Sequence, residues 1–270
     1  MAIVPVEDRD TKAVTPVRSR GLVLVFAAVC AGASALLILS GADSALSRQV
    51  IMFMQATRTL SVTVAGIANL YEVKGVTAAA VLWWLWFRRG GDNVIDQRVS
   101  SAAVFLVTVA AIAVGRVTAN FLPFRPRPAS DPALVGEFAR TDEFFQDWSS
   151  FPSDHALLFG AFAAAVTHLA PRLGWILLTF HTLFVVSLPR LLTGRHYLSD
   201  ILAGLALGAA LGWLLLPVMM RWTAASWVRV PESWKRPGIG YAAMFLMTFE
   251  LATNFDGARK VLSHLASLLD

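Results

Sequence analysis

The sequence predicts an all-α protein, a polytopic bundle of transmembrane helices with six core spans and a possible seventh span near the C-terminus. Two observations carry this prediction. The 270 residues are 56% hydrophobic and only 15% charged, whereas a soluble domain averages about 25% charged residues. The apolar residues also come in blocks of roughly 15–21, close to the length that crosses a bilayer core as a helix. This composition excludes an ordinary water-soluble enzyme.

The N-terminal part begins with a polar, basic segment, residues 1–20, which indicates a disordered cytoplasmic tail. The first predicted span follows at residues 21–40. Its apolar run is longer than the ~7–15 residues of a signal-peptide core, so we expect a span and not a cleaved leader. Residues 44–70 are interrupted by Arg48 and Arg58. This pattern indicates an interfacial helix that leads to the second span.

Five further apolar blocks complete the predicted six-span domain, which we place at residues 21–220. They are residues 73–87, 99–119, 151–170, 173–188 and 201–220. Residues 221–270 form a C-terminal extension. In it, the apolar segment 238–253 contains Glu250 and either spans or re-enters the membrane. Apolar residues at helical spacing then predict an amphipathic helix over 257–269, on the membrane or on the bundle.

The basic residues near the span ends set the predicted orientation. With the N-terminus inside, just over half of the 23 Lys and Arg residues lie on the cytoplasmic side of a bacterial-type plasma membrane. Four arginines border spans on the outer side instead: Arg125, Arg127, Arg190 and Arg195. The net charge of +5 is thus divided between two membrane faces. It does not form the single patch of a nucleic-acid-binding protein, so we expect membrane lipids as surroundings and no nucleic-acid partner.

Three segments on the outer side hold the polar residues that can carry chemistry. They are residues 120–128 at the end of the third span, 152–155 at the start of the fourth, and 190–200 between the fifth and sixth. Arginine guanidinium groups match phosphate oxygens and stay charged at any working pH. The N-terminus of a helix also favours a phosphate. Together these segments predict an oxyanion site for phosphoryl chemistry, facing the extracytoplasmic side.

Histidines and carboxylates supply the acid–base groups of this predicted site. His196 and Asp200 are four residues apart, a spacing that lets the carboxylate reach back to the imidazole and orient it as a nucleophile or base. His155 comes from a different helix and is available to protonate a leaving oxygen. Ser153 is placed to cap the fourth helix. No carboxylate cluster has the spacing expected of a hard-cation site.

The same residues resemble the pattern of the type 2 phosphatidic acid phosphatase (PAP2) family, integral-membrane lipid phosphatases related to vanadium-dependent haloperoxidases. The family pattern is Lys-x6-Arg-Pro, then Pro-Ser-Gly-His, then Ser-Arg-x5-His-x3-Asp. Arg127-Pro128, Pro152-Ser153 with His155, and Arg190 with His196 and Asp200 match it in order and spacing.

The resemblance implies a mechanism and a role for each matched residue. His196 would attack phosphorus and form a phosphohistidine, while Asp200 holds its ring. His155 would protonate the departing group and then activate water. The phosphate oxygens would be held by Arg127, Arg190 and Ser153. The family needs no metal, so the resemblance implies neither a metal nor another cofactor.

Three positions depart from the family pattern. Asn120 stands where the family has lysine; as a candidate phosphate ligand it can donate a hydrogen bond but supplies no charge, and Arg125 is the candidate to supply that charge. Pro189 replaces the serine of the third motif, and Asp154 replaces the glycine of the second. An acid at a helix N-terminus suits the helix dipole, but it repels a phosphate if it points inward.

The Pro-Ser-Asp-His form also bears on the substrate, because bacterial members that resemble undecaprenyl-diphosphate phosphatases often carry it. The resemblance therefore favours a polyprenyl diphosphate. The alternatives are a phosphatidate or phosphatidylglycerol-phosphate phosphatase, a lipid phosphotransferase, and a non-catalytic protein that binds or transports lipid phosphates.

Other polar and small residues have structural interpretations beside the functional ones. Arg125 and Arg195 are either phosphate ligands or interfacial anchors, and Arg116, inside the third span, is expected to pair within the bundle.

The loop 129–150 is predicted to be solvated, with a lid over the site as the alternative. Close helix packing is predicted where glycine recurs at every fourth residue of the sixth span, at Gly204, Gly208 and Gly212.

Overall fold

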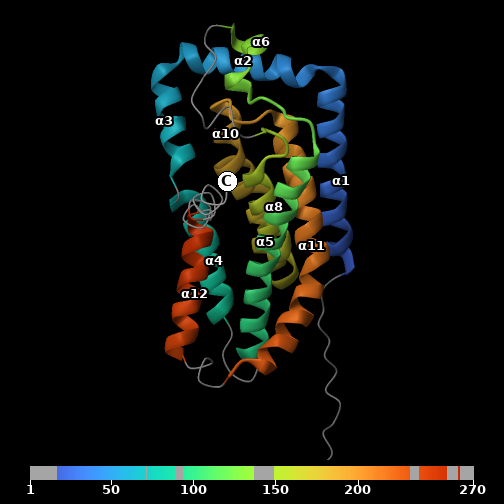
Figure 1. Ribbon diagram of the computed structural model, residues 1–270, viewed down its shortest axis with the longest axis vertical. Coiled ribbons are helices and arrows are strands. Elements are labelled where there is room, and N and C mark those ends of the chain that lie inside the picture. The colour runs from blue at the N-terminus through green and yellow to red at the C-terminus, as the bar shows by residue number, and fades with distance from the viewer. Residues whose placement is uncertain are drawn as a thin grey trace, which may run out of the picture.

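The computed structural model describes residues 17–70, 72–88, 94–136, 149–231, 237–253 and 261. Within these ranges every regular element is a helix (Figure 1), so the all-α prediction is confirmed. The α-helices are α1 (Val17–Ser40), α2 (Ala42–Ala56), α3 (Arg58–Asn69), α4 (Thr77–Phe87), α5 (Val94–Phe121), α6 (Pro132–Val135), α8 (Asp154–Leu169), α9 (Pro171–Ile176), α10 (Leu188–Leu192), α11 (Leu198–Arg229) and α12 (Pro237–Ala252). Two π-helical segments, η1 (Glu72–Val76) and η4 (Leu177–Ser187), and a 3-10 turn, η2 (Pro128–Ser130), connect them.

The segment predicted as one interfacial helix, residues 44–70, consists of two helices. α2 lies across the upper end of the molecule, whereas α3 turns down its side and leads through η1 towards α4 (Figure 1). The bend between the two directions is 111°, and it falls at Thr57, whose backbone leaves the helical region. The prediction of a single helix is therefore wrong, and the interfacial position of α2 stays a prediction. α3 extends the second predicted span, and several of its apolar side chains are exposed, as expected for a surface that faces lipid.

The number of spans differs from the prediction. Among the described helices, four are long and apolar enough to cross a membrane: Gly21–Ser40, Gln97–Phe121, Pro171–Leu192 and Leu198–Arg229. Counting the bent pair α2 with α3–α4 gives five. The predicted six or seven spans are not confirmed, because α8 and α12 have 16 residues each. Such a helix measures about 24 Å, less than the ~30 Å of a hydrocarbon core. Most of α8 is also buried by neighbouring helices.

α8 is the central helix of the bundle. It packs against α5, α9, η4 and α11, and its side chains from Ala156 to Thr167 are buried. The glycine face of α11 lies directly on it: a Cβ atom added at Gly208 would lie 2.3 Å from the Leu157 carbonyl oxygen. The predicted close packing of this glycine face is confirmed, and it brings the N-terminal ends of α8 and α11 together.

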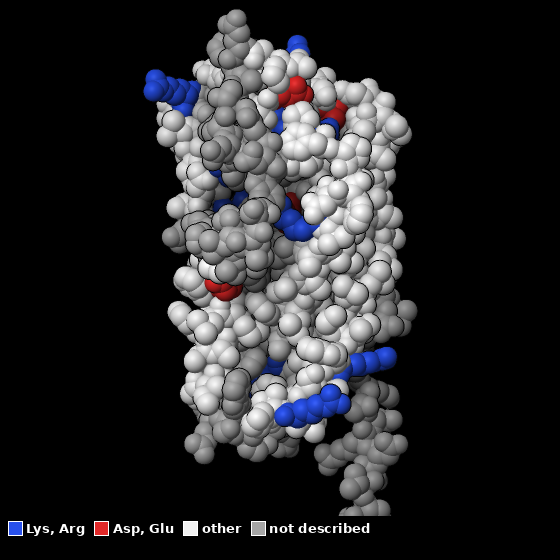
Figure 2. All heavy atoms as spheres, viewed as in Figure 1, with Lys and Arg blue, Asp and Glu red and all other residues white. Residues whose placement is uncertain are grey.

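Charged side chains divide between two levels of the molecule. On the face shown in Figure 2, the described charged side chains at the lower end are basic, while basic and acidic side chains occur together in the upper half. The predicted tail 1–20 and the amphipathic helix 257–269 lie outside the described residues, except for 17–20 and 261, and so does the loop 129–150 between 137 and 148.

Candidate active site

The three motif segments meet in the upper half of the bundle, where α8 and α11 begin. Backbone hydrogen bonds join them: the Ser153 N–H donates to the Asp200 carbonyl (3.0 Å), the Ala129 N–H to the Gly194 carbonyl (2.9 Å) and the Ser150 N–H to the Arg125 carbonyl (2.9 Å). Gly194 has φ +66°, and a Cβ atom there would lie 2.7 Å from the Cβ of Ala129. A glycine is therefore required in the turn that leads to His196.

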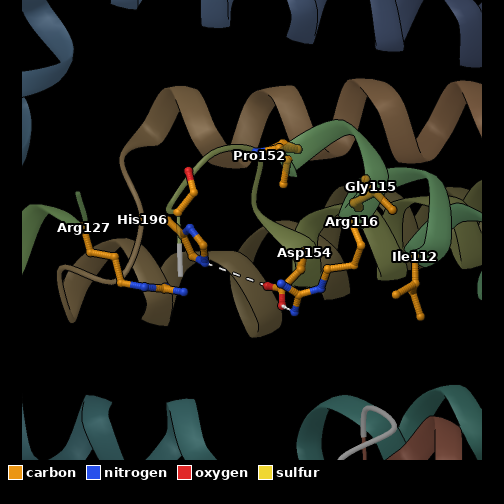
Figure 3. Close-up of a pocket in the computed structure, with 10 residues that line it drawn as sticks. Ile112, Gly115, Arg116, Arg127, Pro152, Asp154 and His196 are labelled. Atoms are coloured by element: carbon orange, nitrogen blue, oxygen red, sulfur yellow. Dashed lines mark hydrogen bonds and ion pairs between the residues drawn. The ribbon is translucent and has the colours of Figure 1, made fainter. Parts of the chain in front are cut away.

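His196 is buried, with 3% of its surface exposed. Its Nδ1 lies 2.8 Å from the carbonyl oxygen of Ser150. Because a carbonyl oxygen only accepts, Nδ1 carries the hydrogen, and in the neutral ring Nε2 carries the lone pair. Nε2 faces Asp154, whose Oδ1 is 4.0 Å away (Figure 3). The nitrogen that can act as a nucleophile therefore faces the interior of the site.

Asp200 lies close to this ring but does not hydrogen-bond to it. Its Oδ2 is 3.8 Å from His196 Nδ1, beyond hydrogen-bond distance. The two carboxylate oxygens accept from the Tyr197 N–H at 2.8 Å and from Arg125 Nη1 at 2.5 Å. The expected reach from Asp200 to the imidazole is thus an electrostatic contact, and the ring is held by the Ser150 carbonyl.

Arg125 does not line the cavity in front of His196. Its Nη2 donates to Asp43 at 2.7 Å, and its Nη1 donates to Ser199 as well as to Asp200. The guanidinium also lies 3.9 Å from the centre of the Tyr197 ring. The side chain expected to replace the charge of the family lysine is therefore engaged with two carboxylates.

Asp154 points into the site, between the two motif histidines. Its Oδ1 lies 2.8 Å from His155 Nδ1 and its Oδ2 3.0 Å from Arg116 Nη2. Figure 3 shows His196, Asp154 and Arg116 in a row, with Arg127 on the other side of His196. Arg116 pairs within the bundle, as expected, but its partner is a residue of the site.

A small cavity lies in front of His196, lined among others by Arg116, Arg127, Ser149 and Asp154. Its volume is about 20 Å³, room for about one water molecule. Burial lowers the pKa of Arg127, while the neighbouring Asp154 raises it. An arginine stays protonated in proteins even so. The cavity therefore combines permanent positive charge with a nucleophilic nitrogen.

The other predicted phosphate ligands differ in where their side chains lie. Arg190 is buried in α10 and its Nη1 donates to the Val186 carbonyl at 3.1 Å. Ser153 occupies the N-cap position of α8 without the predicted side-chain capping bond, since Asp154 Oδ1 accepts the His155 N–H in the first turn. In the described part of the chain, the buried Ser153 hydroxyl has no hydrogen-bond partner.

Two predicted residues lie away from the cavity. Asn120 is exposed near the end of α5 and does not line it. The Arg195 side chain donates to Asn69 of α3 at 2.9 Å, whereas its backbone carbonyl accepts from Arg127 at 3.0 Å. Arg195 thus anchors α3 to the turn before His196.

Sequence reasoning missed Asp43, a buried carboxylate on α2 that contacts both Arg125 and Ser199. The contact with Ser199 joins residues 156 positions apart, so no local spacing indicates it. Among the described residues, no group of three His, Cys, Asp or Glu side chains is arranged to hold a metal ion.

Comparison with known proteins finds a family model that matches the motif-bearing region. Residues 120–224 match the model described as the PAP2 superfamily, and this segment contains all three motifs. A protein of Bacillus licheniformis named bacitracin transport permease protein BcrC is 26% identical over 139 residues, which cover 52% of this chain and 61% of that protein. The lipid A 1-phosphatase of Rhizobium etli is 33% identical over 94 residues, 32% of this chain and 36% of that protein.

The chain thus spans less than two thirds of the length of the curated relatives that it matches. Among solved structures, a PAP2-type phosphatidylglycerolphosphate phosphatase from Bacillus subtilis superimposes with a TM-score of 0.46 at 18% identity, covering 75% of this chain and 96% of that one.

Proposed function

We propose that this multi-pass membrane protein, whose residues 120–224 match the PAP2 superfamily model, is a metal-independent phosphohydrolase that removes phosphate from a lipid phosphate or diphosphate. One observation carries the proposal: Nε2 of His196 faces a cavity lined by two arginines, with His155 bound to the carboxylate in front of it. A nucleophile, positive charge for a phosphate and a second proton-transferring group are thus within one site.

The reaction proceeds in two steps through a phosphohistidine. Nε2 of His196 forms a bond to phosphorus while the bond from phosphorus to the leaving oxygen breaks, and His155 protonates that oxygen. His155 then removes a proton from a water molecule, which attacks phosphorus and releases inorganic phosphate from His196. The positive charge that the ring gains in the first step is stabilised by the Ser150 carbonyl at 2.8 Å and by Asp200 at 3.8 Å.

The phosphate group enters by displacing Asp154. A cavity of about 20 Å³ has room for only one water molecule or so, and the Asp154 carboxylate already lies near the place that a phosphate must take. Once Asp154 turns away, the phosphate oxygens meet Arg116, Arg127 and His155. Arg190 and the unpaired Ser153 hydroxyl complete the proposed set of ligands.

The proposed substrate is a polyprenyl diphosphate such as undecaprenyl diphosphate. The Pro-Ser-Asp-His form of the second motif supports this choice. The relative named lipid A 1-phosphatase supports the broader class, a phosphate carried on a lipid. We place the site on the extracytoplasmic side of a bacterial-type plasma membrane, where the lipid tail stays in the bilayer and the headgroup reaches the arginines.

Phosphate release by the purified protein tests the proposal. We expect release from undecaprenyl diphosphate by the unmodified chain and none by His196→Ala. His168→Gln is the matched control, because His168 stacks on Trp213 away from the motifs, and its release should stay within about twofold of the unmodified chain. A metal chelator should leave the rate of phosphate release unchanged.

If the intact protein releases no phosphate from any lipid, the phosphohydrolase proposal is wrong. If His196→Ala still turns over, the mechanism is wrong.

The same assay distinguishes the alternatives. Release from phosphatidate or phosphatidylglycerol phosphate, but not from the diphosphate, reassigns the substrate. Appearance of the phosphoryl group on an added lipid alcohol indicates a phosphotransferase. The name of the relative BcrC keeps a transport role as a further alternative, and binding of a lipid phosphate without release would favour it.

A further inference from the structure

A buried carboxylate outside the motifs, Asp43 of α2, contacts the start of α11. It is 2% exposed. Its Oδ1 accepts the Ser199 N–H at 3.1 Å, and its Oδ2 accepts from the Ser199 hydroxyl and, at 2.7 Å, from Arg125 Nη2. Both oxygens are thus used in bonds to two residues.

The second guanidinium nitrogen of Arg125, Nη1, contacts Asp200, the carboxylate beside the proposed nucleophile His196. Nη1 donates to Asp200 Oδ1 at 2.5 Å and to the Ser199 hydroxyl at 2.7 Å. Asp200 is fully buried, and its other oxygen is 3.8 Å from His196 Nδ1. One guanidinium therefore bridges α2 and α11 and divides its hydrogen bonds between two buried carboxylates.

Because Arg125 shares its hydrogen bonds between Asp43 and Asp200, it determines how the Asp200 carboxylate is held. An arginine prefers to bind one carboxylate with two parallel hydrogen bonds. Here Nη2 of Arg125 is bonded to Asp43, so only Nη1 donates to Asp200. The second Asp200 oxygen therefore keeps its hydrogen bond from the Tyr197 N–H, next to His196. With two carboxylates to one guanidinium, the cluster also keeps a net negative charge beside the ring that becomes cationic.

We propose that Asp43 is a positioning residue for the reaction: by holding Arg125 it keeps the Asp200 carboxylate in place and negatively charged beside His196. The inference rests on the proposed phosphohistidine reaction. Without Asp43, both Nη1 and Nη2 of Arg125 bind Asp200. The guanidinium then neutralises the Asp200 carboxylate and draws it away from the His196 imidazole. Because α2 lies across the upper end of the molecule (Figure 1), the catalytic group then depends on a helix outside the PAP2-matched region 120–224.

Asp43→Asn in the full-length protein tests this role. We expect kcat to fall roughly 10- to 100-fold while KM changes less than about threefold, because the loss affects the transition state and not substrate binding. The matched control is Ser34→Ala. The Ser34 hydroxyl is also buried and donates to the Ser199 carbonyl at 2.8 Å, but it has no bond to Arg125 among the described contacts. This variant should keep kcat within about twofold.

A double variant tests whether Asp43 acts through Arg125. Once Arg125→Gln has removed the bridge, adding Asp43→Asn should lower kcat by less than about threefold more, because the two residues act as one unit. If the two single effects multiply instead, Asp43 acts independently of Arg125 and the inference is wrong. Should Asp43→Asn fail to fold, Ser199→Ala removes the hydroxyl shared by both partners, and a roughly three- to tenfold loss in kcat at unchanged KM is expected.

The outcomes separate this inference from the proposed function. Phosphate release by the unmodified chain together with an unchanged kcat in folded Asp43→Asn overturns the positioning role alone. The same holds for an unchanged kcat in Ser199→Ala. Absence of release by the unmodified chain overturns the proposed function, and this inference with it.

Discussion

We expect Asp154 to control whether an anion can enter the site. Its carboxylate lies 4.0 Å from His196 Nε2 and pairs with Arg116 at 3.0 Å. In Asp154→Asn the negative charge is gone and Arg116 can turn to phosphate. We therefore expect inorganic phosphate to inhibit this variant roughly 3- to 10-fold more strongly, in line with about 1 kcal/mol for a partly exposed ion pair.

The inhibition constant of phosphate in steady-state assays measures this effect. Glu250→Gln is the control, because it removes a carboxylate from α12 that does not line the cavity. Unchanged or weaker inhibition of Asp154→Asn would show that the carboxylate does not compete with phosphate.

His155 is assigned to proton transfer, and the leaving group tests that assignment. With a lipid monophosphate, the leaving alcohol needs a proton, and we expect His155→Asn to lower kcat by about 10²- to 10⁴-fold. With p-nitrophenyl phosphate the leaving phenolate is stable without protonation, so phosphohistidine formation, measured as the burst of p-nitrophenol, should slow much less. Equal losses in the first step for both substrates would contradict the role of His155 as the general acid.

At the residue scale the motifs were predictable and their surroundings were not. His155, His196 and Asp200 follow local spacing, and the structure brings them into one site as expected. Arg125 was predicted as either a phosphate ligand or an interfacial anchor, but its partners Asp43 and Asp200 lie 82 and 75 positions away in the sequence. Such contacts depend on how helices pack, which local spacing does not encode.

At the scale of elements, the contact between α8 and α11 sets the geometry of the site. In Gly208→Ala the new Cβ atom would lie 2.3 Å from the Leu157 carbonyl oxygen, so one helix must move. We expect a loss of about 1–3 kcal/mol in stability, seen as a lower unfolding temperature in detergent, together with a lower kcat.

Gly32→Ala on α1 is the matched control for this substitution. Nothing lies within 4 Å of a Cβ atom at Gly32, and alanine is the better helix former. This variant should be as stable as the unmodified protein. If Gly208→Ala unfolds at the same temperature as Gly32→Ala, the close packing of α11 on α8 does not limit stability.

Hydropathy located the apolar helices but not their lengths or bends. α8 was predicted as a span because it is apolar, yet it begins only at Asp154 and is enclosed by its neighbours. The break at Thr57 divides a segment that was predicted as one helix. Burial in lipid and burial in protein select the same residue types, so sequence alone could not separate a short core helix from a span.

At the scale of the whole molecule, the positions of the basic residues predict the orientation in the membrane. The site lies in the upper half and α11 ends at the lower end (Figure 1). We expect Ala133→Cys on α6 to react with a membrane-impermeant maleimide in intact cells, and Val228→Cys near the end of α11 to react only after permeabilisation. The native Cys30 is buried and should react little. The reverse labelling pattern would place the site on the cytoplasmic side.

Trapping the covalent intermediate tests the central claim most directly. The protein is mixed with undecaprenyl diphosphate carrying ³²P in its terminal phosphate and quenched in alkali, in which a phosphohistidine survives. We predict label on the peptide that contains His196, lost on mild acid treatment and absent from His196→Ala. Phosphate release without labelled protein, or label on a different residue, would contradict the account.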